Sequence, residues 1–503
     1  MPMILDRLAS LARSRPGDAA VVGDSESLTY AALQARVERL AQHLANERCR
    51  IIALPADNSP EWIVADLAAW AAGATLIPVP LFFAPTQVAH MLESSHVDTI
   101  LVPRGQESGP LPERFARHSV DLDGLSVYRS SVSAHSAHEP GCAKITYTSG
   151  STGTPRGVRL AGSTLDDIVQ RLVSVFGDLG IRRHLCTMPL ATLLENVAGV
   201  YVPLALGATI YTPSLSRLGL YGSSQIDADR FCSTIEMTGA ESLILQPQTL
   251  RELAAYLRSR ERQSPPSLKF VAVGGAKVAQ SDLDDAAVAG IPAYQGYGLS
   301  ECASVVALNL PGRSRAGSVG RPLPGLDIDI AADGEILVTG QAMLGYCDEA
   351  LGESGPVATG DIGYRDADGY LYVTGRKKNV FITSFGRNVA PEWPEALLLH
   401  EPEIAQACVF GEAMPSNTAV IVPAPSMDVL NVTRAVTRAN RELPDYARIG
   451  DWVLASEPFD IANGLSTATG KPRRDAIAER YLANGTQAPV LPVPGPSQSS
   501  IRL

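Results

Sequence analysis

One segment of this 503-residue chain organises the rest: Tyr147-Thr148-Ser149-Gly150-Ser151-Thr152-Gly153-Thr154-Pro155-Arg156-Gly157. Its glycines let the backbone turn so that several N–H groups point into one concavity, and such a concavity attracts anions. The hydroxyl side chains add hydrogen-bond donors, and Arg156 adds a fixed positive charge. This composition favours a polyphosphate loop, although the Gly-x-x-x-x-Gly-Lys-Ser/Thr pattern of the Walker loop is absent. A surface loop rich in Gly, Ser and Thr has the same composition, so the rest of the chain must decide between the two.

Helix and strand patterns alternate around this segment. Residues 30–40 have apolar side chains at helical spacing after Thr29, a suitable N-cap, and residues 62–72 and 165–176 are further expected helices. Short apolar strands are expected at residues 50–54, 76–79, 99–102, 185–190, 208–211, 243–245 and 268–273. This alternation indicates a parallel α/β sheet, in which ligands bind at the carboxyl ends of the strands. We therefore expect the loop at residues 148–157 and the turns Gly274-Gly275-Ala276 and Gly296-Tyr297-Gly298 to be neighbours.

The pattern changes near Ser318. Short strands with polar turns follow at residues 327–330, 335–340 and 369–373, which indicates an antiparallel or barrel-like section. The basic run Arg376-Lys377-Lys378 marks the start of a smaller α+β unit. We predict an N-terminal domain over residues 1–376, a C-terminal domain over residues 377–483, and a disordered tail over residues 484–503, where Gly, Pro, Gln and Ser dominate.

Composition narrows the class of protein. The chain is 45% hydrophobic and 19% charged, as in ordinary globular enzymes, and its net charge of −11 argues against general nucleic-acid binding. The seven cysteines are scattered and no His-Glu-x-x-His occurs, so we expect no zinc site, no disulfide framework and a cytoplasmic setting. The N-terminus lacks the apolar run of a signal peptide.

Residues 67–92 carry no Asp, Glu, Lys or Arg, but Gly73 and three prolines interrupt them, which favours a buried helix, a strand and a second helix over a transmembrane segment.

Four further segments combine residue types suited to a nucleotide. Residues 294–301 set an aromatic ring, a hydroxyl and a carboxylate beside a glycine turn, and these groups can stack on a base, bind a phosphate and hold Mg²⁺. Asp361 lies on a tight turn, fit to accept ribose hydroxyls. Residues 372–378 contain Arg376 and Lys378, and residues 465–474 contain Lys471 between Gly470 and a proline.

These five segments, in this order, resemble the adenylate-forming (AMP-binding) superfamily, which includes acyl-CoA synthetases, luciferases and the adenylation domains of peptide synthetases. The resemblance covers residues 1–480. It implies an α/β fold with a large N-terminal domain of layered α/β subdomains plus a β-barrel section, and a small mobile α+β C-terminal domain. Residues 189–195 and 386–392 are similar to segments of the long-chain fatty acid–CoA ligases in particular.

The resemblance also implies a role for individual residues toward ATP. It assigns the β- and γ-phosphates to the glycine-rich loop, here Thr148, Ser149, Gly150, Ser151, Thr152 and Gly153. The turn Gly274-Gly275-Ala276 would lie behind the adenine and the acyl group, and Tyr297, next to Gly298, would stack on the adenine.

Six residues would serve the chemistry itself. Ser300 would contact the α-phosphate and Glu301 would ligate Mg²⁺, while Asp361 and Arg376 would hold the ribose. Lys378 matches the hinge between the domains. Lys471 matches the lysine that meets the carboxylate, the ribose and the side from which pyrophosphate departs.

The chemistry needs these residue types. A carboxylate must attack an α-phosphate, and because both are anions, Mg²⁺, the N–H groups of the loop and a lysine are required to neutralise the charge. Only six of the 42 basic residues are lysines, so a lysine is an informative choice in this chain. Each residue also has an ordinary structural explanation: Lys471 as a solvated lysine, Glu301 as a helix N-terminal acid, Tyr297 as a core residue and Asp361 as a turn acid.

Three departures from the family pattern bear on the substrate. Arg156 stands where the family often has Lys, and Thr192 stands where many relatives carry a His or an aromatic gating residue. Leu190 stands near the position at which amino-acid-activating members place an Asp, which argues against an α-amino acid.

The sequence therefore predicts an ATP- and Mg²⁺-dependent carboxylic acid ligase that forms an acyl-adenylate and then a coenzyme A thioester, from a fatty or other hydrophobic acid. One alternative is an enzyme that passes the acyl group to an amine or to an acyl or peptidyl carrier protein. Another is a degenerate nucleotide-binding protein without activity, against which the intact Glu301, Asp361, Arg376 and Lys471 argue.

Overall fold

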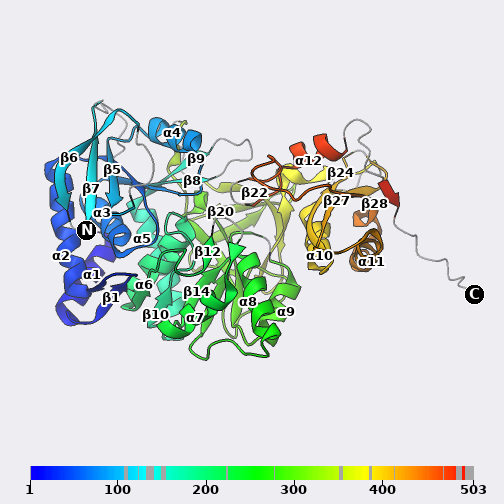
Figure 1. Ribbon diagram of the computed structural model, residues 1–503, viewed down its shortest axis with the longest axis horizontal. Helices are drawn as coiled ribbons and strands as arrows, with labels where there is room; N and C mark the ends of the chain where they lie inside the picture. Colours follow the sequence, from blue (N-terminus) through cyan, green and yellow to red (C-terminus); the bar gives the residue numbers. More distant parts are fainter. Residues whose placement is uncertain are drawn as a thin grey trace, which may run out of the picture.

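Two large mixed sheets form the framework of the N-terminal two thirds of the chain (Figure 1). The computed structural model describes residues 2–106, 112–122, 124–131, 141–148, 155–221, 225–276, 278–349, 355–384, 388–412, 414–467, 470–482 and 490–492.

The first sheet has eight strands in the order β21-β9-β8-β4-β3-β5-β7-β6, and the neighbours β8, β4, β3 and β5 run parallel. Because β9 folds back antiparallel to β8, the two strands are the arms that flank the glycine-rich loop. The strands are β3 (Ile51–Pro55), β4 (Thr75–Val79), β5 (Thr99–Pro103), β6 (Phe115–Leu122), β7 (Leu125–Ser130), β8 (Cys142–Thr148), β9 (Arg156–Ala161) and β21 (Gly345–Tyr346).

The second sheet has nine strands in the order β18-β17-β16-β15-β14-β10-β11-β1-β2. Its six strands from β16 to β1 are parallel, so their carboxyl ends share one edge. The strands are β1 (Ala19–Val22), β2 (Ser27–Thr29), β10 (Arg183–Leu185), β11 (Thr209–Tyr211), β14 (Ser242–Leu245), β15 (Phe270–Val273), β16 (Ala293–Leu299), β17 (Ser304–Leu308) and β18 (Arg321–Pro322). The predicted α/β alternation is confirmed.

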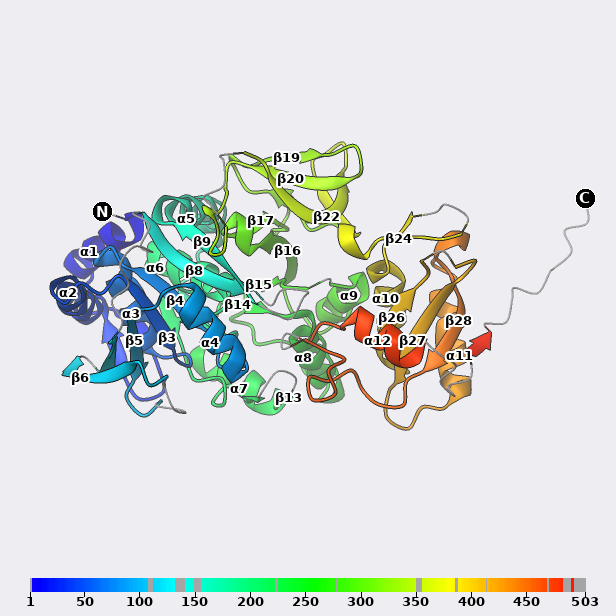
Figure 2. The ribbon, with the colours of Figure 1, turned by 90° about the horizontal axis from the view of Figure 1, so that it is seen from above.

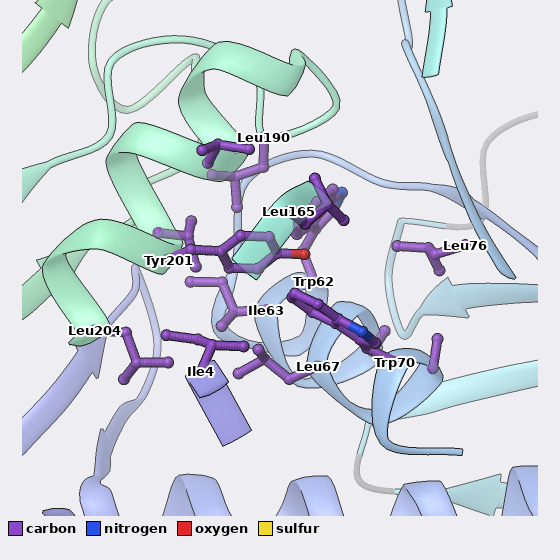
Figure 3. Close-up of a cluster of buried hydrophobic side chains, with 14 of the residues drawn as sticks. Ile4, Trp62, Ile63, Leu67, Trp70, Leu76, Leu165, Leu190, Tyr201 and Leu204 are labelled. Atoms are coloured by element: carbon purple, nitrogen blue, oxygen red, sulfur yellow. The ribbon is translucent and has the colours of Figure 1, made fainter. Parts of the chain in front are cut away.

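Helices pack between and around these sheets. The helix α2 begins as expected, because the Thr29 hydroxyl accepts a hydrogen bond from the Ala32 N–H at 3.2 Å. The helices are α1 (Met3–Ser14), α2 (Tyr30–Asn46), α3 (Pro60–Ala71), α4 (Pro85–Ser94), α5 (Gly162–Phe176), α6 (Val202–Leu206), α7 (Ala228–Thr238), α8 (Pro247–Ser259) and α9 (Gln280–Val288). The main core joins side chains of both sheets with those of α1, α2, α3 and α5, and Figure 3 shows its centre around Trp62 and Tyr201. Residues 67–92 form the end of α3, β4 and most of α4, as expected, and no helix among the described residues is long and apolar enough to cross a membrane.

The section predicted to be antiparallel is a four-stranded sheet in the order β19-β20-β22-β23. Its strands are β19 (Asp327–Ile330), β20 (Glu335–Thr339), β22 (Val357–Arg365) and β23 (Leu371–Arg376). The short helix η4 (Lys377–Asn379) follows β23 directly. Figure 2 shows this sheet above the two large sheets, with β22 on the side of the C-terminal part.

The C-terminal part has cores of its own, centred on Trp452 and on Phe459. It contains the hairpin β24 (Phe381–Ile382) and β25 (Asn388–Val389), and the sheet β26-β27-β28-β29. The remaining bounds are α10 (Glu392–His400), β26 (Ile404–Phe410), β27 (Asn417–Pro423), α11 (Val429–Ala439), β28 (Ile449–Leu454) and α12 (Arg474–Tyr481).

The predicted disordered tail needs one correction. Within residues 484–503, Val490–Pro492 forms β29, which pairs antiparallel with β28. Two apolar residues at an open sheet edge gain backbone hydrogen bonds there, and a prediction from overall composition overlooks so short a strand. The rest of the tail lies outside the described residues.

Candidate active site

The arms of the glycine-rich loop are in place. Thr148 and Arg156 are directly paired across β8 and β9, so the intervening segment begins and ends at one point. The predicted phosphate ligands Ser149, Gly150, Ser151, Thr152 and Gly153 lie outside the described residues. Arg156 donates to Glu349 Oε1 at 2.5 Å, and its guanidinium lies 3.6 Å from the centre of the Tyr346 ring.

Gly274 and Gly296 meet at the carboxyl edge of the second sheet, as predicted, but Gly296-Tyr297-Gly298 is not a turn, because it lies within β16 and pairs with β17. The strands β15 and β16 are parallel neighbours, and a methyl group at Gly274 would lie 3.5 Å from the Gly296 carbonyl oxygen. Gly275 has φ +81°, which a side chain would make unfavourable. Any side chain at Gly298 would collide with the backbone of Ser304. The backbone therefore approaches closely where the adenine was predicted, and only glycine permits this.

Tyr297, Asp361 and Arg376 form one hydrogen-bonded group. The Tyr297 hydroxyl donates to Asp361 Oδ2 at 2.6 Å, and Arg376 Nε lies 2.9 Å from Asp361 Oδ1. Asp361 and Arg376 face each other across β22 and β23, which explains why residues so far apart in sequence meet. Arg376 also donates to the Thr359 carbonyl at 3.2 Å and remains 43% exposed, so its other face is open to a ligand.

Burial and charge oppose each other at this group. Burial raises the pKa of Asp361, while Arg376 and the hydrogen bond from Tyr297 lower it. Burial and the neighbouring Asp361 raise the pKa of Tyr297, so the phenol stays neutral and remains a donor. The hydroxyl of Tyr297 is thus held by Asp361, and its ring packs beside the core of the antiparallel sheet.

Ser300 and Glu301 lie in the short helix η3 (Ser300–Cys302), at the end of β16. Ala303 and Ser304 follow with φ of 49° and 107°, which are strained values for residues with side chains. Glu301 Oε1 accepts from the Tyr346 hydroxyl at 2.9 Å. Because Tyr346 also stacks under Arg156, it links the predicted Mg²⁺ ligand to the arm of the glycine-rich loop.

Lys471 comes to this group from the C-terminal part. It lies on a turn closed by hydrogen bonds between its backbone and Thr467. The Lys471 side chain remains accessible to water, but partial burial by the surrounding protein lowers its pKa. The nearby Arg376 and Lys378 lower that pKa further, whereas Asp361 raises it. Burial and then Arg376 also lower the pKa of Lys378. The structure therefore brings Lys471 into the field of Asp361 and Arg376, and Lys378 into the field of Arg376.

Three features were missed or misjudged. Tyr346 has no sequence signal, because only the pairing of β21 with β9 brings it to Glu301. Lys144 is a charged residue within an otherwise apolar strand, a pattern that could have indicated a buried ion pair. It is fully buried and pairs with Asp66 of α3 at 2.7 Å. The burial of Leu190, which is 1% exposed and belongs to the core of Figure 3, was not foreseen; it does not test the argument drawn from this residue against an α-amino acid, which stays a prediction.

Comparison with known proteins identifies the family. The model of the AMP-binding enzyme family matches residues 8–347, and the model of the AMP-binding enzyme C-terminal domain matches residues 378–484. The chain belongs to the AMP-binding enzyme family. It is an adenylate-forming ligase of the acyl-CoA synthetase type.

Individual relatives cover nearly the whole chain. The long-chain-fatty-acid–CoA ligase FadD15 of Mycobacterium bovis is 25% identical over 514 residues, covering 84% of this chain and 85% of the relative. The solved o-succinylbenzoate CoA synthetase of Bacillus subtilis, in complex with its acyl-adenylate intermediate, has a TM-score of 0.74 and 22% identity, covering 93% of this chain and 97% of the other. The amide bond synthetase McbA of Marinactinospora thermotolerans has a TM-score of 0.74 and 24% identity, covering 94% and 99%. These structures confirm the predicted fold of a large N-terminal and a small C-terminal domain.

Proposed function

We propose that the enzyme activates a hydrophobic carboxylic acid with ATP and Mg²⁺ and then transfers the acyl group to coenzyme A. The observation that supports this most is the convergence of Asp361, Arg376 and Lys471, which come from two strands and from the C-terminal part. The Asp361 carboxylate can accept hydrogen bonds from ribose hydroxyls. The two cations beside it can neutralise the negative charge of a nucleotide phosphate and of the carboxylic acid that attacks it.

Each of these residues would bind a different part of the nucleotide. Asp361 would accept the ribose hydroxyls, and the exposed face of Arg376 would donate to them. Tyr297 would place its ring against the adenine, backed by Gly274, Gly275 and Ala276. Ser300 would donate to the α-phosphate, and the loop from Thr148 to Gly153 would hold the β- and γ-phosphates.

A magnesium ion fits at Glu301. Mg²⁺ commonly binds one or two carboxylates together with substrate phosphates and water, so a single glutamate suffices. Tyr346 orients this carboxylate through its hydrogen bond to Oε1, and Glu301 would hold the ion. When bound, the ion would neutralise phosphate charge.

Lys471 would act where the charges meet. An acid oxygen attacks the α-phosphorus, the bond from that phosphorus to the bridging oxygen breaks, and pyrophosphate leaves. The ammonium of Lys471 would pair with the acid and with the negative charge that gathers on the α-phosphate. One such preorganised donor commonly contributes roughly 10²–10³ in rate.

The domain boundary is part of the proposal. Residues 377–483 would move as one unit relative to residues 1–376, with Lys378 as the hinge. The separate cores of the C-terminal part and the position of Lys378 in η4, directly after β23, support this assignment. The movement would replace Lys471 at the active site by the groups that serve acyl transfer.

Coenzyme A is the acceptor that FadD15 and the Bacillus subtilis synthetase have by their names, and McbA makes amide bonds by its name. The test is product analysis by mass spectrometry with fatty, aryl and α-amino acids, each offered coenzyme A, amines or a phosphopantetheinyl carrier protein. We expect an acyl-CoA from a hydrophobic acid. An amide, or acyl transfer to the carrier alone, would refute the assigned acceptor and favour the alternative activity.

A further inference from the structure

A loop of seven residues, Met188 to Leu194, leaves the carboxyl end of β10 and reaches the turn assigned to the acyl group. A methyl group at Gly274 would lie 3.8 Å from Leu194 Cδ2. The loop is therefore in a position to shape the space beside that turn.

A buried carboxylate closes this loop. Glu195, directly after it, has no solvent exposure, and its Oε2 accepts the Met188 N–H at 3.1 Å. The other oxygen lies 3.3 Å from His184 Nε2, and His184 Nδ1 lies 2.9 Å from the Ser242 hydroxyl. The end of the loop is thus tied to its own beginning and to two strands of the sheet.

Asn58, in the segment between β3 and α3, holds the same loop from another side. Its side-chain amide donates to the Met188 carbonyl at 2.9 Å, and its side-chain oxygen accepts the Leu190 N–H at 2.8 Å. Two buried side chains, one from the segment after β3 and one from the helix η2, therefore fix three backbone groups of one short loop.

The helix that carries Glu195 is unusual. Residues Glu195–Tyr201 form the π-helix η2, a form that is rare and frequently found at functional sites. A methyl group at Gly199 would collide with Glu195 Oε1 and lie 2.9 Å from His184 Nε2. The carboxylate can keep its place only because residue 199 is glycine.

The cluster is a hydrogen-bonded group rather than a metal site. His184, Cys186 and Glu195 bring one ligand atom each within 4.8 Å of one another. However, the Cys186 thiol donates to the Gly199 carbonyl at 3.6 Å, whereas a metal requires the thiolate.

We propose that Glu195 is a positioning residue for acid selection, which holds the loop from Met188 to Leu194 so that its side chains define the acid-binding space. This inference rests on the proposed function. A displacement of reacting groups by about 1 Å can cost roughly 10²-fold in rate, so a loosened loop should have a kinetic signature.

The test compares matched variants in acid-dependent pyrophosphate release, with wild type first shown to be active. Gly199→Ala displaces the carboxylate without removing it, and Gly177→Ala is its control, because nothing lies within 4 Å of a methyl group there. Glu195→Ala removes the carboxylate. Its control is Glu241→Ala, a buried carboxylate that binds the Arg182 N–H at 2.6 Å at the other end of β10.

We expect Gly199→Ala and Glu195→Ala to lower kcat/KM for the preferred acid by about 10- to 100-fold. They should also weaken discrimination between acids that differ by one methylene, while the KM for ATP stays near wild type. Glu195→Gln, which keeps an acceptor for Met188, should restore most of the selectivity, and both controls should behave as wild type.

Unchanged acid selectivity in folded Gly199→Ala would overturn the proposal, and so would stoichiometric metal in the purified enzyme. If Glu195→Ala does not fold, Asn58→Ala serves the same purpose, since it loosens the loop from its other side. A wild-type enzyme inactive with every acid would refute the proposed function instead, so the two failures are distinguishable.

Discussion

Lys144 offers a test of how the main core of the N-terminal part is stabilised. Lys144 and Asp66 are 2% and 1% exposed, and their charged atoms lie 2.7 Å apart. The ammonium uses all three protons, on Asp66, on the Tyr201 hydroxyl at 2.9 Å and on the Asn196 side-chain oxygen. Asp66 Oδ2 also accepts from Asn196 at 2.8 Å and from Tyr201 at 2.7 Å. Every charged atom of the pair is therefore satisfied without water.

Lys144→Met keeps the apolar stem of the side chain and removes the charge, which leaves the Asp66 carboxylate buried without its cation. Losing one partner of such a pair costs about 3–5 kcal/mol. Because Asn196 and Tyr201 still donate to Asp66, we expect the lower end, about 3 kcal/mol, a large part of the roughly 5–15 kcal/mol that stabilises a typical domain. Asp66→Asn should lower the free energy of unfolding by a similar amount, because it leaves the buried Lys144 ammonium without its anion.

The assay is urea unfolding followed by tryptophan fluorescence, because the Trp62 ring lies 5.8 Å from Lys144 Nζ. The matched control is Lys269→Met. This lysine is 44% exposed and pairs at 3.2 Å with Glu241, which is buried but also accepts the Arg182 N–H, so losing the exposed cation should cost less than about 1 kcal/mol. The double variant of Lys144 and Asp66 should cost less than the two single changes added together. A Lys144→Met enzyme within about 1 kcal/mol of wild type, or strictly additive effects, would refute the reasoning.

Four further predictions concern the site. Lys471→Ala should lower adenylate formation by roughly 10²-fold or more with the fold and ATP binding intact, measured by single-turnover formation of acyl-adenylate; a near-normal rate would remove the assigned role. Lys378→Pro should slow acyl transfer more than adenylation, measured as separate half-reactions, and equal losses would argue against a hinge. Tyr297→Phe removes a hydrogen bond that lowers the pKa of Asp361, so that pKa should rise. If Asp361 binds the ribose as proposed, ATP requires its ionised form. ATP binding should then be lost at a higher pH as the solution is acidified, and an acid limb of kcat/KM for ATP that does not move upward would contradict this. Glu301→Gln should raise the Mg²⁺ concentration needed for half-maximal rate, and an unchanged Mg²⁺ titration would move the ion elsewhere.

Local patterns were sufficient where a feature depends on neighbours in sequence. The cap at Thr29 and the apolar spacing of α2 follow from helix geometry, and the meeting of Gly274 and Gly296 follows from the rule for parallel strands. Asp361 and Arg376 were predicted as a pair through the family resemblance, and the hairpin of β22 and β23 supplies the physical reason.

Contacts between residues that are far apart in the sequence could not be predicted from local patterns. The partners Lys144 and Asp66 are 78 residues apart, and nothing in either segment identifies the other. The contact of Tyr346 with Glu301 requires β21 at the edge of the first sheet. The burial of Leu190 depends on which way a short loop turns after β10, and a residue count along the motif does not fix that direction.

The most direct test of the account is ATP–pyrophosphate exchange in the presence of a carboxylic acid and the absence of any acceptor. The account predicts exchange that requires a hydrophobic acid and Mg²⁺, and that Lys471→Ala reduces by at least roughly 10²-fold. Exchange that proceeds without acid, or no exchange with any acid of the panel, would contradict the claim that Asp361, Arg376 and Lys471 assemble a site for acyl-adenylate formation.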